Sequence, residues 1–213
     1  MLGDAQLIVR GLPLTVALTV SAFVIGAILG LPIMMARRSR FFLVSASAAA
    51  FITFVRSIPT LVWLFVIFFG LGSGYVQFSP FSAAVIGLGV IASANMAEIY
   101  RGGLLSIHHG QWDAAAALDL GRVNTFRDVI WPQTFRVALP SAATYAVGLL
   151  KDSSVASVIG VAEISYRGYQ LSQITYRGLD VFGIVAAIYI VIGLPIAWLS
   201  RVADAHLRAK VAH

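Results

Sequence analysis

Residues 57–97 read SIPTLVWLFVIFFGLGSGYVQFSPFSAAVIGLGVIASANMA and contain no charged side chain. As one helix they would extend for about 60 Å, because each helical residue adds about 1.5 Å, whereas the hydrocarbon layer of a bilayer is about 30 Å thick. The chain must therefore fold back within this stretch. The glycines of Gly70–Gly74 and the pair Ser79-Pro80 break helices and predict the position of the turn. We expect one membrane-spanning helix at about 51–71 and the next at about 81–101.

The composition of the whole chain has the same character. Of 213 residues, 59% are hydrophobic and 11% are charged, whereas soluble domains average roughly 45–50% and 25%. This balance, with a mean hydropathy of +0.88, excludes a soluble enzyme, a disordered chain and a nucleic-acid-binding domain. The 15 Lys and Arg residues are scattered among hydrophobic segments and form no basic face. The absence of cysteine excludes a disulfide framework and a thiolate metal site.

Three further spans are predicted, at about 11–36, 137–161 and 181–201. The first is followed by its positive charges, whereas a cleaved signal peptide carries them in front of a shorter apolar segment. We therefore interpret it as a retained helix. The second contains a Lys-Asp pair, and the third is uncharged. The expected fold is an all-α integral membrane domain over residues 1–213 with five transmembrane helices.

The loops between the predicted spans differ in charge. Three basic residues fall on one side, namely Arg10, Arg167 and Arg177. Ten fall on the other side, namely Arg37, Arg38, Arg40, Arg101, Arg122, Arg127, Arg136, Arg201, Arg208 and Lys210. Because an excess of Lys and Arg marks the cytoplasmic side of a membrane protein, the N-terminus is expected outside and the C-terminus inside.

The loop between the third and fourth spans, about 107–132, contains a helix-forming segment, GQWDAAAALDLG at Gly110–Gly121. Alanine is the strongest helix former, and Asp113 lies in the first turn, where a carboxylate suits the helix dipole. Gly121 suits the position just after a helix end, and a second short helix is expected before Pro132. The alanine surface permits two interpretations: a docking surface for another protein, or a loop lying on the membrane interface.

This loop resembles the EAA loop of ATP-binding-cassette (ABC) importer permeases. The matching residues are Asp113, Ala114, Ala115, Gly121 and Pro132, with Asp113 where that family usually has Glu. The resemblance implies that the segment is a coupling helix that sits in a groove on a cytoplasmic ATPase.

Four other segments are similar to the branch of that family that carries polar amino acids of the histidine, glutamine, glutamate or arginine type. They depart from its pattern at Ser57 and Ile58, and Asn95, just ahead of the second segment, stands where that branch commonly has an aromatic residue. In chain order the segments are RSIPTL at 56–61, AEIYRGG at 97–103, PQTFRVALP at 132–140 and LLKDSSVASVI at 149–159, the last followed by Glu163-Ile164.

The resemblance implies a permease of the bacterial inner membrane that translocates polar amino acids by alternating access. Its expected partners are cassette ATPase subunits, a second permease subunit (identical or related), an extracellular solute-binding protein, an amino acid substrate and membrane lipids, with no nucleic acid. The chain has no Gly-x-x-x-x-Gly-Lys-Ser/Thr phosphate loop, so ATP and magnesium are expected on the ATPase. The chain itself is then neither an enzyme nor a cofactor or metal carrier.

Ionisable residues inside a membrane are functional candidates, because a Lys at the bilayer centre costs roughly 2.5–3.5 kcal/mol. Lys151 and Asp152 are adjacent and point about 100° apart on a helix, so they cannot face each other. Each needs another partner, and two remain open: a zwitterionic substrate, with Ser153 beside it, or a structural ion network between helices.

Glu98 and Arg56 complete the candidate pathway, each with a structural alternative. Glu98 lies one helical turn from Arg101 and can form a local ion pair with it. Arg56 can extend to the lipid headgroups or into the pathway. A different class of function, an intramembrane hydrolase using Lys151 and Ser154, lacks a glycine turn for an oxyanion hole. An importer of another small polar solute is the nearer alternative.

Overall fold

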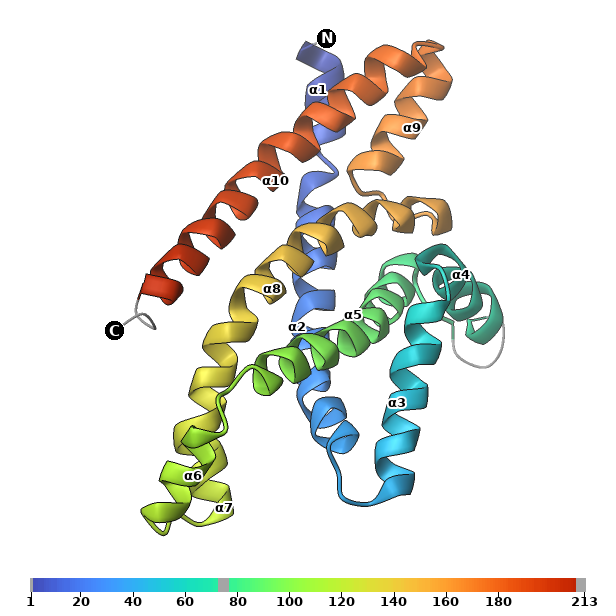
Figure 1. The fold of residues 1–213 in the computed structure, drawn as a ribbon. Helices are drawn as coiled ribbons and strands as arrows, with labels where there is room; N and C mark the ends of the chain where they lie inside the picture. The colour runs from blue at the N-terminus through green and yellow to red at the C-terminus, as the bar shows by residue number, and fades with distance from the viewer. Residues whose placement is uncertain (1, 73–76, 210–213) are drawn as a thin grey trace.

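The computed structural model describes residues 2–72 and 77–209, and all of its regular elements in these ranges are helices (Figure 1). The α-helices are α1 (Leu2–Val9), α2 (Leu12–Arg37), α3 (Phe42–Ser57), α4 (Thr60–Phe65), α5 (Pro80–Leu105), α6 (Gly110–Ala117), α7 (Arg122–Asn124), α8 (Trp131–Asp152), α9 (Ile164–Thr175) and α10 (Gly178–Ala209). Two π-helical segments, Val66–Leu71 and Thr125–Ile130, and one 3-10 helix, Ser153–Ile159, continue α4, α7 and α8.

Helices α2 and α5 form the centre of the molecule and make the most extensive helix pair in the described ranges. Their contact depends on small side chains. A Cβ atom built on Gly26 would lie 2.4 Å from the Cβ of Ala92, and one built on Gly30 would lie 2.7 Å from the Cβ of Met96. Glycines four residues apart let two helix backbones approach closely within a membrane. The Gly26-x-x-x-Gly30 spacing therefore explains why these two helices pair.

Three helical segments in the described residues are long and apolar enough to cross a bilayer: Gly3–Arg37, Pro80–Leu105 and Gly178–Trp198. The pair Phe42–Ser57 and Thr60–Leu71 adds a fourth if it counts as one bent span. The predicted span 137–161 is not among them. Its helix, α8, ends at the polar pair Lys151-Asp152, and a 3-10 helix follows. The count of five spans stays a prediction.

The helix predicted over 51–71 is interrupted at Ile58-Pro59. Helix α3 ends at Ser57, and the next helix leaves at an angle of 100°. Ile58 is extended (φ −98°, ψ 131°), and so is Pro59 (ψ 143°). The proline ring excludes its preceding residue from the helical region, which is why the helix breaks here.

The predicted turn before the third span ends where expected, at Ser79-Pro80. Ser79 accepts a hydrogen bond from the Ser82 amide (3.1 Å), and Pro80 occupies the first turn of α5. Both residues suit a helix start. Ser73 and Gly74 of the predicted breaker lie outside the described residues.

The molecule has two distinct ends. In Figure 1, α6 and α7 lie at one end together with the turn between α2 and α3, while α1, α9 and the start of α10 lie at the opposite end. The basic residues of that turn and those of the loop around α6 therefore share an end. Lys210, assigned to the same side, lies outside the described residues.

Candidate functional site

Helix α6 presents different faces to the chain and to solvent. It packs against the π-helical segment Thr125–Ile130, and Ala115 on that side is only 2% exposed. Ala114 and Asp113 are exposed on the other side. The Asp113 carboxylate lies 3.1 Å from His109 Nδ1, one turn back on the same surface. The predicted coupling residues therefore separate: Ala115 belongs to the packing of the loop, and Ala114 to its surface.

The chain reverses at Asp119, not at Gly121. Asp119 has a left-handed backbone (φ 54°), a conformation that Asp tolerates better than most residues. Gly121 has φ −59° and is the residue before α7, so the prediction that it ends α6 is wrong. Around this reversal, Leu118 is 74% exposed and Val123 is 75% exposed. The end of the molecule thus carries apolar side chains that no part of the described chain covers.

Pro132 does not end a helix, contrary to prediction. It lies in the first turn of α8, where the missing N–H of proline matters least. Helical backbone runs from α7 through Thr125–Ile130 into α8. Proline and π-helical turns are both known causes of helix distortion, and they occur together here.

An aromatic contact connects the loop to the central helices. The Trp131 ring lies 5.6 Å from the Tyr100 ring of α5 and 6.1 Å from the Phe126 ring, measured between centroids. Ile130 beside it is fully buried. On the surface of the same segment, Arg127 Nε donates to Asp128 Oδ1 (2.7 Å), and this hydrogen bond lowers the pKa of the Asp128 carboxyl. Through these rings the segment that follows α7 contacts α8, and α8 contacts α5.

A polar cavity of about 470 Å³ lies between α3, α5 and α8. It brings together Arg56 from the end of α3, Asn95 and Glu98 from α5, and Ser141 from α8. Glu98 also pairs with Arg101, whose Nη2 lies 2.6 Å from Glu98 Oε2. The predicted local pair is confirmed. Arg56 lines the same cavity as Glu98, and its role in a pathway stays a prediction.

Lys151 and Asp152 do not line this cavity, and both are exposed on the surface of the single chain. Neither forms an ion pair with any residue in the ranges 2–72 and 77–209. Ser153 is buried and donates to the Leu150 carbonyl oxygen (2.7 Å). Ser154 donates to the Lys151 carbonyl oxygen (2.7 Å), so its hydroxyl is engaged with the backbone and not with the Lys151 amine.

One face of α8 connects the cavity to Asp152. Ser141, Tyr145, Gly148 and Asp152 follow at intervals of four, three and four residues, which places them on one helical stripe. The Tyr145 hydroxyl is buried and makes no hydrogen bond within the described chain. Asn95, which borders the cavity, donates its Nδ2 to the Ile91 carbonyl oxygen instead (2.9 Å). Asn95, Ser141 and Tyr145 were missed from the sequence, although the spacing back from Asp152 would have indicated the last two.

Glu163 forms a second polar centre that was not predicted as a site. It is fully buried, and its Oε1 accepts from the Tyr166 amide at 2.8 Å. Its Oε2 accepts from the Tyr189 hydroxyl at 2.8 Å and from Thr15 Oγ1 at 3.5 Å. These partners belong to α9, α10 and α2. Glu163 therefore joins three helices at the end of the molecule opposite α6.

Among the described residues, no group of three or more His, Asp or Glu side chains could hold a metal ion.

The chain matches the family described as "Binding-protein-dependent transport system inner membrane component" over residues 22–211. The chain therefore belongs to this family of membrane-embedded transport subunits.

Relatives narrow the assignment. The chain is 34% identical over 182 residues to the probable amino-acid ABC transporter permease protein YckA of Bacillus subtilis (strain 168), covering 85% of this chain and 80% of the relative. It is 33% identical over 197 residues to the glutamine transport system permease protein GlnP of Escherichia coli (strain K12), covering 92% and 90%. It is thus the permease component of an ABC importer, a transport subunit whose relatives are amino-acid permeases.

Solved structures agree with this assignment. The fold matches a chain of an amino acid ABC transporter crystallised with histidines, with a TM-score of 0.90, 32% identity, and coverage of 97% of this chain and 96% of that chain. It also matches a chain of the inward-facing methionine ABC transporter MetNI, with a TM-score of 0.80 and 23% identity over 96% of each chain. At that identity, the second match supports the fold alone.

Proposed function

We propose that this chain is the transmembrane subunit of an importer that moves polar amino acids across the bacterial inner membrane by alternating access. A separate ATPase, holding ATP and magnesium, supplies the energy. The similarity to amino-acid permeases supports the class of substrate. The single observation that carries the coupling mechanism is the exposed apolar surface around the reversal after α6.

The coupling surface consists of Ala114, Leu118 and Val123 on the outside of α6 and α7. When a partner covers exposed apolar side chains, the free energy of binding becomes more favourable by about 25 cal/mol per Å² of apolar surface buried. Nucleotide binding shifts the permease only if the ATPase binds one arrangement of the permease better than the other. Trp131 contacts both Phe126 and Tyr100, so a change at the coupling surface is transmitted to α5 through this side chain.

The proposed pathway runs from Lys151 and Asp152 along α8 to the cavity with Arg56 and Glu98. A free amino acid carries a carboxylate and an ammonium group, which Lys151 and Asp152 can bind respectively. Both side chains are exposed and without ion-pair partners in the described chain. We therefore place a second permease subunit, identical or related, against this surface, so that the pathway lies between two chains.

The orientation follows from charge. The basic turn between α2 and α3 and the loop around α6 share one end, and a Lys and Arg excess marks the cytoplasm. In this arrangement α6 faces the ATPase, and the N-terminus lies outside. The segment 163–180, with α9 and the start of α10, then faces the extracellular solute-binding protein.

Reconstitution tests the proposal. The chain, copurified with its ATPase, is placed in proteoliposomes with the solute-binding protein, and ATP-dependent uptake of each of the twenty amino acids is measured. We expect uptake of polar amino acids, with altered substrate affinity in the Lys151→Met and Asp152→Asn variants. The Arg10→Gln variant, at an exposed basic residue outside the proposed pathway, is the control. Uptake of only a non-amino-acid solute would replace the substrate assignment, and variants with lowered thermal stability but unchanged affinity would assign the pair to structure.

A further inference from the structure

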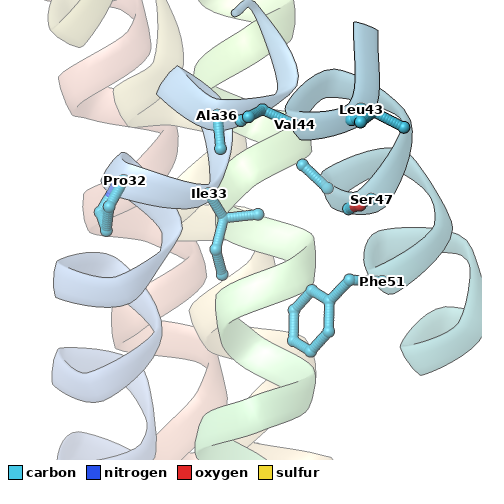
Figure 2. Close-up of a pocket in the computed structure, with 8 residues that line it drawn as sticks. Pro32, Ile33, Ala36, Leu43, Val44, Ser47 and Phe51 are labelled. Atoms are coloured by element: carbon cyan, nitrogen blue, oxygen red, sulfur yellow. The ribbon is translucent and has the colours of Figure 1, made fainter. Parts of the chain in front are cut away.

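An apolar groove of about 650 Å³ lies between α2 and α3 (Figure 2). Figure 2 shows that its walls come from the last turns of α2 and the first turns of α3. The residues that define it are Ile33 and Ala36 from α2, and Leu43, Val44, Ser47 and Phe51 from α3. Apart from Ser47 the lining is apolar, and the groove is open to the surface, so its polarity suits a hydrocarbon chain.

The turn that closes this groove is basic and aromatic. It contains Arg37, Arg38 and Arg40 and continues into Phe41 and Phe42, which are 60% and 82% exposed. In the described part of the chain, none of the three arginines forms an ion pair with a carboxylate. Aromatic side chains beside basic ones are typical of the membrane–water interface. The turn therefore suits the depth of lipid headgroups.

The three arginines have different positions. Arg37 Nη1 donates to Ser45 Oγ (3.1 Å), and Ser45 Oγ donates to the Arg37 carbonyl oxygen (2.8 Å), which holds the turn against α3. The Arg40 guanidinium lies 4.8 Å from the Phe41 ring centroid, on the exposed part of the turn. Arg38 instead lines a separate cavity of about 290 Å³ with Leu104 and Trp112. Arg37 and Arg40 therefore lie in the short segment between the groove residues Ala36 and Leu43, and Arg38 faces the loop around α6.

We propose that the α2–α3 groove binds an anionic phospholipid of the inner leaflet. One acyl chain lies in the groove between Ile33 and Phe51, and the phosphate lies against Arg40 and Arg37. Charge complementarity selects this occupant: a zwitterionic lipid would fill the same groove but would leave the arginine charges without a net negative partner. The leaflet rests on the proposed orientation, whereas the preference for anionic headgroups follows from the turn alone.

Native mass spectrometry of the full chain in detergent tests this directly, with dioleoyl phosphatidylglycerol and dioleoyl phosphatidylcholine as probes. The two lipids share their acyl chains, so a difference in binding reports the headgroup. Each basic residue near an anionic surface contributes about 1 kcal/mol, or about fivefold in binding. We expect the wild-type chain to prefer phosphatidylglycerol at least fivefold, and the Arg40→Gln variant to show a preference about fivefold lower than wild type.

Two matched controls separate the site from general surface charge. Arg38→Gln removes the same charge from the same turn but from the other face, and it should leave the preference unchanged. Ser47→Trp fills the groove and should reduce binding of both lipids, whereas Thr53→Trp, at an exposed residue of α3 that does not line the groove, should not. Melting temperatures of the lipid-free variants show whether each one folds.

Three results would overturn the proposal. The first is equal binding of the two lipids by the wild-type chain, and the second is an equal loss in Arg38→Gln and Arg40→Gln. The third is a Ser47→Trp variant that binds both lipids normally but no longer pairs with a second permease subunit, which would assign the groove to a protein interface. None of these measurements depends on transport, so they stand apart from the test of the proposed function.

Discussion

Truncation of Leu118 to alanine is the sharpest test of the coupling surface. The side chain is 74% exposed, and complete burial of a leucine contributes about 1.5–3 kcal/mol. Because roughly three quarters of its surface is available to a partner and alanine retains the Cβ, Leu118→Ala should weaken docking by about 1–2 kcal/mol. That loss corresponds to roughly a 5- to 30-fold rise in the Kd for the ATPase.

The assay is binding of the purified ATPase to the chain in nanodiscs, measured by biolayer interferometry, together with ATP hydrolysis by the assembled complex. Ile174→Ala is the control, because Ile174 is 76% exposed at the opposite end of the molecule. Exposed apolar residues rarely contribute to the stability of the chain itself, so both variants should melt at the wild-type temperature. The Kd should rise only for Leu118→Ala.

Equal Kd values for the two variants, within a factor of two, would refute the reasoning. Docking would then depend on polar contacts or on another surface, and the exposure of Leu118 would have no bearing on coupling. A rise in Kd that accompanies a lower melting temperature would also count against it, because the residue would then act through the fold.

Three further predictions concern packing. Gly26→Leu should lower the free energy of unfolding by about 1–3 kcal/mol through overpacking and reduce the melting temperature. Gly183→Leu, where a Cβ would have open space around it, should not. Equal melting temperatures for the two variants would exclude a close contact between α2 and α5. Glu163→Ala should lower the free energy of unfolding by about 1–3 kcal/mol for each of the two donors at 2.8 Å that lose their acceptor. In the same melting assay Glu163→Gln should retain much of the wild-type stability, and an alanine variant as stable as wild type would contradict the network. Ala115→Trp should lower the melting temperature, and Ala114→Trp should instead raise the Kd for the ATPase; the reverse pattern would show that the two alanine faces are misassigned.

The central helices were predictable because their signals are local. The charge-free runs predicted spans at 11–36 and 81–101, close to the observed α2 and α5, since exclusion of charge from a bilayer acts on each residue separately. The segment Gly110–Gly121 likewise predicted a helix, and α6 occupies its first eight residues. The end of that helix was misplaced, because glycine is the commonest left-handed residue and Asp119 adopts that conformation here.

The candidate pathway was predictable only in part. Glu98 and Arg101 are one turn apart, so their ion pair depends on a single helix and was found from spacing. The cavity depends on three helices, because it places Arg56 beside Asn95 and Ser141. Arg56 and Asn95 are 39 positions apart along the chain, and Asn95 and Ser141 are 46 apart. Such distances in sequence carry no information about contact until the angles between helices are known, and the 100° bend at Ile58-Pro59 is one of those angles.

By itself, the sequence determined that the chain is helical, lies in a membrane, carries an alanine-rich helix between two apolar segments, and resembles ABC permeases. Hydropathy, helix propensity and motif spacing are properties of neighbouring residues, so no fold was needed to find them. Only the tertiary structure decided that Ala115 faces inward and Leu118 outward, that Lys151 and Asp152 are exposed on the single chain, and that Glu163 joins three helices. These facts depend on which faces of distant helices meet, and packing alone sets them.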